Sequence, residues 1–136
     1  MDVFENFENQ LKANPKTIVF TEGTDARILS AASKLLAGKI LNVLLLGNPE
    51  AVKKAAAEGG FDITGAEICD PTSYPEFDAM VAKMVELRKG KMTEEQCRAA
   101  LSKSNYFGTM LVKMGKADCL LGGATYSTAD TCLLYT

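Results

Sequence analysis

The hydrophobic positions of this chain alternate between the spacing of strands and the spacing of helices. Short apolar runs lie at Thr17–Phe20, Leu41–Leu46 and Asp118–Leu121, and a weaker one lies at Glu67–Cys69. The Leu41–Leu46 run is almost continuously apolar. Such a run is typical of a strand buried on both faces of a parallel sheet. We therefore predict strands at these positions.

Amphipathic stripes with helical spacing fill the segments between the strands, beginning with Phe4, Phe7 and Leu11. The residues that mark their ends are Asp2 with Glu5, Pro15, Thr24 or Asp25, Gly38, Asn48 with Pro49, Gly59 with Gly60, Pro75, Thr93 with Gln96, and Gly115. Because strands and helices alternate, the predicted fold is a three-layer α/β/α unit with a mainly parallel sheet. Residues 1–136 form one domain in this interpretation. The order of the strands does not follow from the pattern.

Charge and hydropathy exclude several classes of partner. The chain of 136 residues has 15 lysines and arginines against 17 aspartates and glutamates, a net charge of −2. No basic patch for nucleic acid or an anionic membrane is expected from this balance. The apolar runs are too short to cross a bilayer, and the amino terminus lacks the features of a signal peptide. We expect a cytoplasmic protein.

The content of histidine and cysteine limits the chemistry. There is no histidine, which removes the Ser-His-Asp arrangement and the commonest general base. The four cysteines are scattered without a C-x-x-C pair, so no metal site is expected. In a cytoplasmic protein they are expected to be reduced and mostly buried.

Two segments are placed to form a ligand site, because ligands of parallel α/β sheets bind beyond the carboxyl ends of the strands. Glu22–Arg27 follows the first strand, and Gly122–Asp130 follows the last. The second segment has two glycines that allow close approach of the backbone to a ligand. Its hydroxyl residues stand at the start of an expected helix, where free amides attract phosphate or carboxylate.

Each candidate residue also has an ordinary structural interpretation. Ser127 or Thr128 could simply cap the helix, and the residues alone do not decide between a cap and a ligand site. Tyr126 could point into a site or pack on its own domain. Arg27, Arg88 and Arg98 are the cations to consider near an anion, although the commoner role for each alone is that of a solvated or ion-paired surface residue.

Three segments together resemble the phosphotransacetylases. They are Thr17–Gly23 followed by Asp25–Arg27, Ser104–Lys113, and Ala117–Ala124 running into Ser127–Thr131. Members of that family have two α/β domains with the active site in the cleft between them. The resemblance implies that this chain is most of a first domain, incomplete at its carboxyl end. It also implies that the catalytic residues, a Ser–Arg pair and an Asp, lie outside the chain.

The resemblance implies reversible acetyl transfer between acetyl-CoA and inorganic phosphate, with coenzyme A as a substrate and no permanently bound cofactor. The substrate-binding residues that it implies are Arg27, Arg88, Thr125, Tyr126, Ser127 and Thr128. Many members have histidine where Tyr126 stands. A third substrate-contacting arginine, expected just after Thr131, is replaced by Cys132–Thr136.

From the resemblance we expect a homo-oligomer with small-molecule substrates and no acetyl transfer by the isolated chain. Three alternatives stay open. The chain could belong to a phosphate butyryltransferase, to the phosphotransacetylase-like region of some malic enzymes, or to a non-catalytic ligand-binding or interaction module.

Overall fold

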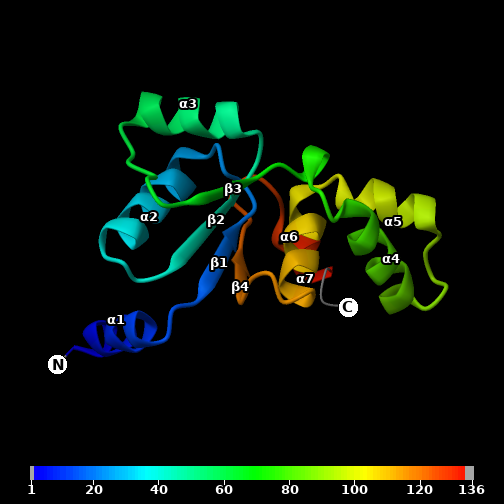
Figure 1. The fold of residues 1–136 in the computed structure, drawn as a ribbon, viewed down its shortest axis with the longest axis horizontal. Helices are drawn as coiled ribbons and strands as arrows, with labels where there is room; N and C mark the ends of the chain where they lie inside the picture. The colour runs from blue at the N-terminus through cyan, green and yellow to red at the C-terminus, as the bar shows by residue number, and fades with distance from the viewer. Residues whose placement is uncertain (1, 134–136) are drawn as a thin grey trace.

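A computed structural model describes residues 2–133 of the chain. The elements lie in the order α1 (Val3–Ala13), β1 (Thr17–Phe20), α2 (Ala26–Ala37), β2 (Asn42–Leu46), α3 (Pro49–Gly59), β3 (Glu67–Cys69), η1 (Pro71–Ser73), α4 (Phe77–Arg88), α5 (Glu94–Leu101), α6 (Ser104–Lys113), β4 (Cys119–Leu121) and α7 (Thr128–Leu133). The predicted alternation of strands and helices is confirmed (Figure 1).

The strands form one parallel sheet in the order β3-β2-β1-β4. The chain runs from β1 outward to β2 and β3, and then returns to pair β4 with the other side of β1. The register places Ile18 opposite Val43 on one side and opposite Cys119 on the other. The direction of winding therefore reverses between β1 and β4, the position where parallel α/β sheets place their ligands.

Alternate residues of β1 and β2 enter two separate cores, as a strand with two buried faces requires. On one face Val19 and Leu44 pack against α4, α5 and α6, with Phe107 fully buried. On the other face Phe20 and Leu45 pack against α2 and α3. The three-layer arrangement is confirmed, and Figure 1 shows the two helical layers on opposite sides of the sheet.

Most helix boundaries follow the predicted signals. Asn48 accepts hydrogen bonds from the N–H groups of the first turn of α3, which has Pro49 at its first position. Gly60 ends that helix in the left-handed conformation, φ 71°. The predicted start of α4 at Pro75 is two residues early, because the backbone at Glu76 is not yet helical, with ψ 21°.

The cysteines are less buried than expected, and the apolar face of α1 is exposed. The apolar stripe of α1 forms a helical face, but Phe4 and Phe7 are 72% and 54% exposed. Of the four cysteines only Cys97 is fully buried, while Cys119 and Cys132 are exposed. Periodicity predicts which side chains share a face, but not whether another element covers that face. No helix in residues 2–133 is long and apolar enough to cross a membrane.

Candidate functional site at the carboxyl edge of the sheet

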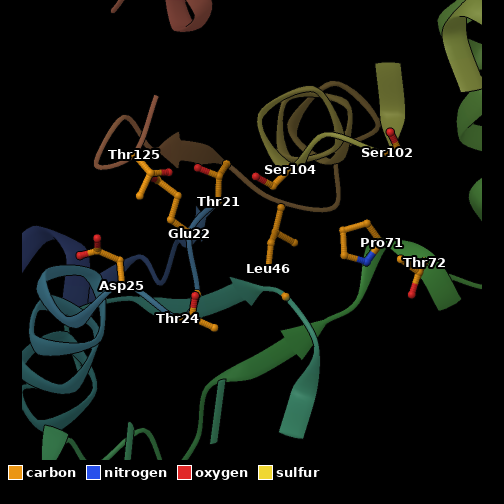
Figure 2. A pocket seen from close by; sticks show the side chains of 12 residues that line it. Thr21, Glu22, Thr24, Asp25, Leu46, Pro71, Thr72, Ser102, Ser104 and Thr125 are labelled. Carbon is orange, nitrogen blue, oxygen red and sulfur yellow. The ribbon is translucent and has the colours of Figure 1, made fainter. Parts of the chain in front are cut away.

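A cavity of about 550 Å³ opens at the carboxyl ends of the strands, where the sheet topology predicts a ligand site. The turns after β1, β2 and β3 contribute to its wall, together with the α5–α6 junction and the loop after β4. Figure 2 shows the lining side chains, which are Thr21, Glu22, Thr24, Asp25, Leu46, Pro71, Thr72, Ser102, Ser104 and Thr125, with Gly23 and Gly47 between them.

Two glycines allow the backbone segments around the cavity to approach one another. The N–H of Gly23 donates to the carbonyl of Leu46 at 3.0 Å, and a Cβ at Gly23 would lie 2.5 Å from that oxygen. A Cβ at Gly122 would collide with the hydroxyls of Tyr126 and Thr21. The turn after β1 is thus in backbone contact with β2, and the loop after β4 lies directly against Thr21.

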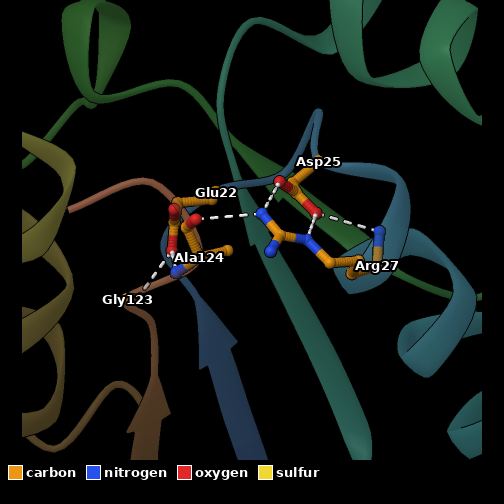
Figure 3. Close-up of polar contacts among 5 residues, drawn as sticks. All are labelled: Glu22, Asp25, Arg27, Gly123 and Ala124. Atoms are coloured by element: carbon orange, nitrogen blue, oxygen red, sulfur yellow. Dashed lines mark hydrogen bonds and ion pairs between the residues drawn. The ribbon is translucent and has the colours of Figure 1, made fainter.

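Glu22 joins the turn after β1 to the loop after β4. Its Oε1 accepts hydrogen bonds from the N–H groups of Gly123 at 2.8 Å and Ala124 at 2.9 Å (Figure 3). Its Oε2 is buried and forms no hydrogen bond within residues 2–133. Burial opposes ionisation of this carboxyl, but the Thr125 hydroxyl and the amides of 123–125 outweigh it, so the pKa of Glu22 lies below 4.5. The Thr125 hydroxyl lowers the pKa of Glu22 through its proximity to the carboxylate, because it makes no well-formed hydrogen bond with Oε2.

Asp25 and Arg27 form a second connection beside Glu22. Asp25 caps α2 and accepts two hydrogen bonds from the Arg27 guanidinium, from Nε at 3.0 Å and from Nη2 at 2.8 Å. The hydrogen bonds from Arg27 lower the pKa of Asp25 to about 2. The same Nη2 donates to the carbonyl of Ala124 at 2.9 Å, as drawn in Figure 3. The Arg27 side chain is 71% exposed and that of Asp25 is 15% exposed, so the guanidinium faces solvent over a largely covered carboxylate.

The cavity is lined by hydroxyl and carboxylate groups. Six of the lining residues carry hydroxyls, and Glu22 and Asp25 add two carboxylates with lowered pKa values. No lysine or arginine of the described part of the chain lines the cavity, but Arg27 is bonded to the lining residue Asp25 and to the carbonyl of Ala124, next to Thr125. Among residues 2–133 no cluster of three or more histidine, cysteine or acidic side chains is placed to hold a metal ion.

The structure brings several of the predicted residues together. Thr125 lines the cavity, and Arg27 contacts the loop that carries it. The Tyr126 hydroxyl is 2.7 Å from Thr21 Oγ1 and shares a hydrogen bond with it, so this ring packs on its own domain. Arg88 does not line the cavity; its Nε donates to Met92 Sδ at 3.0 Å, at the end of α4.

Ser127 acts as a cap in this structure. Its Oγ accepts from the N–H of Asp130 at 3.2 Å and donates to the carboxylate of Asp130 at 2.7 Å. Thr128 is the first residue of α7 and is exposed. The N–H groups of Gly123 and Ala124 are also engaged, by Glu22, and so are not open to an anion. Of the amides expected to be free at the start of α7, that of Asp130 is engaged by Ser127.

Sequence reasoning missed part of the wall. Thr72, Ser102 and Ser104 line the cavity from η1 and from the α5–α6 junction. No motif marks them as site residues. Thr72 follows the weakly marked strand β3, and Ser102 and Ser104 reach the cavity only through the packing of α5 and α6. The role of Glu22 was also missed, since its partners are about one hundred residues away in the chain.

Comparison with known proteins identifies the family of this arrangement. Residues 2–133 match the family model described as phosphate acetyl/butaryl transferase. The chain belongs to that family. The phosphate acetyltransferase of Bacillus subtilis is 46% identical over 130 residues, which are 96% of this chain and 40% of the relative. The corresponding enzyme of Staphylococcus epidermidis is 41% identical over the same share of each chain.

Solved structures of phosphotransacetylases have the same fold. A phosphotransacetylase from Streptococcus pyogenes superposes with a TM-score of 0.92 at 39% identity, over 98% of this chain and 42% of that one. The EutD phosphotransacetylase from Staphylococcus aureus superposes with a TM-score of 0.87, also at 39% identity, over 96% and 39% of the chains. The chain therefore spans about 40% of the length of the relatives that it matches.

Proposed function

We propose that this chain supplies one wall of the site at which acetyl-CoA and inorganic phosphate exchange an acetyl group, giving acetyl phosphate and coenzyme A. The observation that carries the proposal is the cavity at the β1–β4 reversal, in a chain 46% identical to a phosphate acetyltransferase. The family resemblance assigns the catalytic residues to the part of the relatives that this chain does not span. Phosphate butyryl transfer is the second candidate, because the matching family model includes both activities.

The polarity of the wall suggests which of its residues contact the anionic groups of a substrate and which contact its uncharged part. The hydroxyl-lined cavity, with two ionised carboxylates and no lysine or arginine lining it within residues 2–133, disfavours a phosphate group. Arg27 lies at its edge with an exposed side chain. Three of its five N–H donors are used by Asp25 and Ala124, which leaves the two of Nη1. We assign the anionic groups of the substrate to Arg27 and its uncharged part to the hydroxyls.

Titration of the 136-residue chain with acetyl-CoA, followed by amide chemical shifts, tests this assignment. We expect the largest shifts in 21–27 and 122–128. Arg27→Ala should weaken binding, while Arg98→Ala, which breaks a surface pair with Asp78 and Glu94, should not. An equal loss of affinity in both variants, or amide chemical-shift changes confined to other parts of the chain, would contradict the assignment.

Ser127→Ala separates a cap from a contact with substrate. Loss of the cap alone should lower the unfolding free energy by about 1 kcal/mol and leave the affinity for acetyl-CoA unchanged. A residue that contacts substrate should instead lower the affinity at unchanged stability. Since Ser127 already donates and accepts within α7, we expect the first result.

A further inference from the structure

The short segment from Glu22 to Arg27 binds both the N–H and the carbonyl group of Ala124. Glu22 accepts from the N–H groups of Gly123 and Ala124, and Arg27 donates to the carbonyl of Ala124. All three bonds measure 2.8–2.9 Å and connect residues 97–102 positions apart in sequence. Figure 3 shows the loop after β4 enclosed between these two side chains.

The loop between β4 and α7 depends on such contacts for its conformation. Gly123 adopts φ 109°, which glycine reaches without strain, and glycine also gives the loop many alternatives in the absence of a partner. Hydrogen bonds from two amides to one carboxylate are charge-assisted and hence stronger than neutral ones. Thr125, which lines the cavity, directly follows the residue that is held.

We propose that Glu22 is a positioning residue, whose carboxylate fixes the loop after β4 so that Thr125 faces the cavity and Arg27 stays at its edge. This inference rests on the proposed function of the same cavity. The carboxylate also occupies the amides of Gly123 and Ala124. The substrate anion is therefore bound by Arg27 and not by the glycine turn, which distinguishes this loop from a backbone anion site.

Two substitutions at Glu22 and one control test the inference in the 136-residue chain. Glu22→Ala removes both bonds, Glu22→Gln keeps an acceptor of the same shape without the charge, and Glu95→Gln changes an exposed glutamate on α5. In Glu22→Ala we expect hydrogen exchange at Gly123 and Ala124 to quicken about tenfold or more, the factor that corresponds to one lost charge-assisted bond. Exchange in the sheet should stay as in the wild type.

Binding and pH supply readouts that a purely structural role would not change. The Kd for acetyl-CoA should rise about tenfold in Glu22→Ala and be partly restored in Glu22→Gln, while Glu95→Gln binds normally. In the wild type the amide proton shifts of Gly123 and Ala124 should titrate with a midpoint below 4.5, following the lowered pKa of Glu22. This titration should vanish in Glu22→Gln, which serves as the test if the alanine variant does not fold.

The outcomes separate this inference from the proposed function. Unchanged exchange at Gly123 and Ala124 overturns it, as does faster exchange with an unchanged Kd. If the wild-type chain binds no acetyl-CoA, the proposed function of the chain is contradicted. The exchange and pH readouts then still decide whether Glu22 holds the loop: faster exchange and a lost titration support it, and unchanged values overturn it.

Discussion

A methyl group at Gly23 should separate the turn after β1 from strand β2. The Cβ of Gly23→Ala would lie 2.5 Å from the carbonyl oxygen of Leu46 and 3.2 Å from Val52 Cγ2. The nearest atom belongs to the backbone of a central strand, so it cannot rotate away as a side chain could. The turn must move instead, and the hydrogen bond from Gly23 N–H to Leu46, 3.0 Å long, must stretch or break.

The size of the effect follows from three contributions. Overpacking of a dense site costs about 1–3 kcal/mol, and a lost hydrogen bond costs about 1 kcal/mol. The reduced freedom of the unfolded chain returns about 0.4–1 kcal/mol when glycine becomes alanine. The expected loss in unfolding free energy is therefore roughly 1–3.5 kcal/mol.

Urea unfolding followed by circular dichroism measures this loss, provided that the transition is two-state. Gly38→Ala is the matched control, because Gly38 has an ordinary φ of −78°. Its Cβ would lie 3.0 Å from the flexible Ile40 side chain, and the nearest backbone atom, the Lys34 carbonyl oxygen, is at an ordinary contact distance of 3.4 Å. We expect the control to change stability by less than about 1 kcal/mol. A Gly23→Ala protein as stable as the wild type, or a control equally destabilised, would contradict a steric clash at Gly23.

Three further predictions concern the core, the pH dependence and the assembly. Phe107→Ala should lower the unfolding free energy by about 3–5 kcal/mol, because this ring is fully buried and packs edge-on against Tyr74 at 5.2 Å; urea unfolding checks it. The ordinary pKa of an aspartate is 3.8 and that of Asp25 in the folded chain is about 2, so its stabilising contribution is complete above 3.8 and is lost as the pH falls towards 2. Asp25→Asn, which keeps a helix cap, should therefore show a smaller fall in Tm over that interval, and an equal fall would contradict this cause. With Phe4 72% and Leu121 51% exposed, the chain should self-associate, and sedimentation showing a monomer at all concentrations would exclude it.

The fold was predictable because its main signals are local. The apolar run ending at Leu46 and the capping residue Asn48 act within a few positions of the chain, and both are confirmed. The pairing of β4 with β1 could not be predicted, because the helical hairpin α4–α5 and α6 separate it from the other strands. Strand order depends on how whole layers pack, and no short stretch of sequence records that packing.

The candidate site was predicted only in part for the same reason. The two segments that meet, around Glu22 and Gly123, were each recognisable as turns after strands. Their hydrogen bonds exist only because β1 and β4 are neighbours in the sheet. Arg27 contacts the loop after β4, whereas Arg88 does not line the cavity. The assignment of both arginines to substrate stays a prediction.

We propose that this chain forms a substrate-binding wall for acetyl transfer. A chimera tests it most directly, in which 130 residues of this chain replace the matching segment of the Bacillus subtilis phosphate acetyltransferase, to which they are 46% identical. The assay is formation of acetyl-CoA from acetyl phosphate and coenzyme A. We predict a chimera with kcat/KM within about tenfold of the parent enzyme, a much weaker Arg27→Ala chimera, and no activity of the isolated chain. A folded chimera without acetyl transfer, or an isolated chain as active as the parent, would contradict the account.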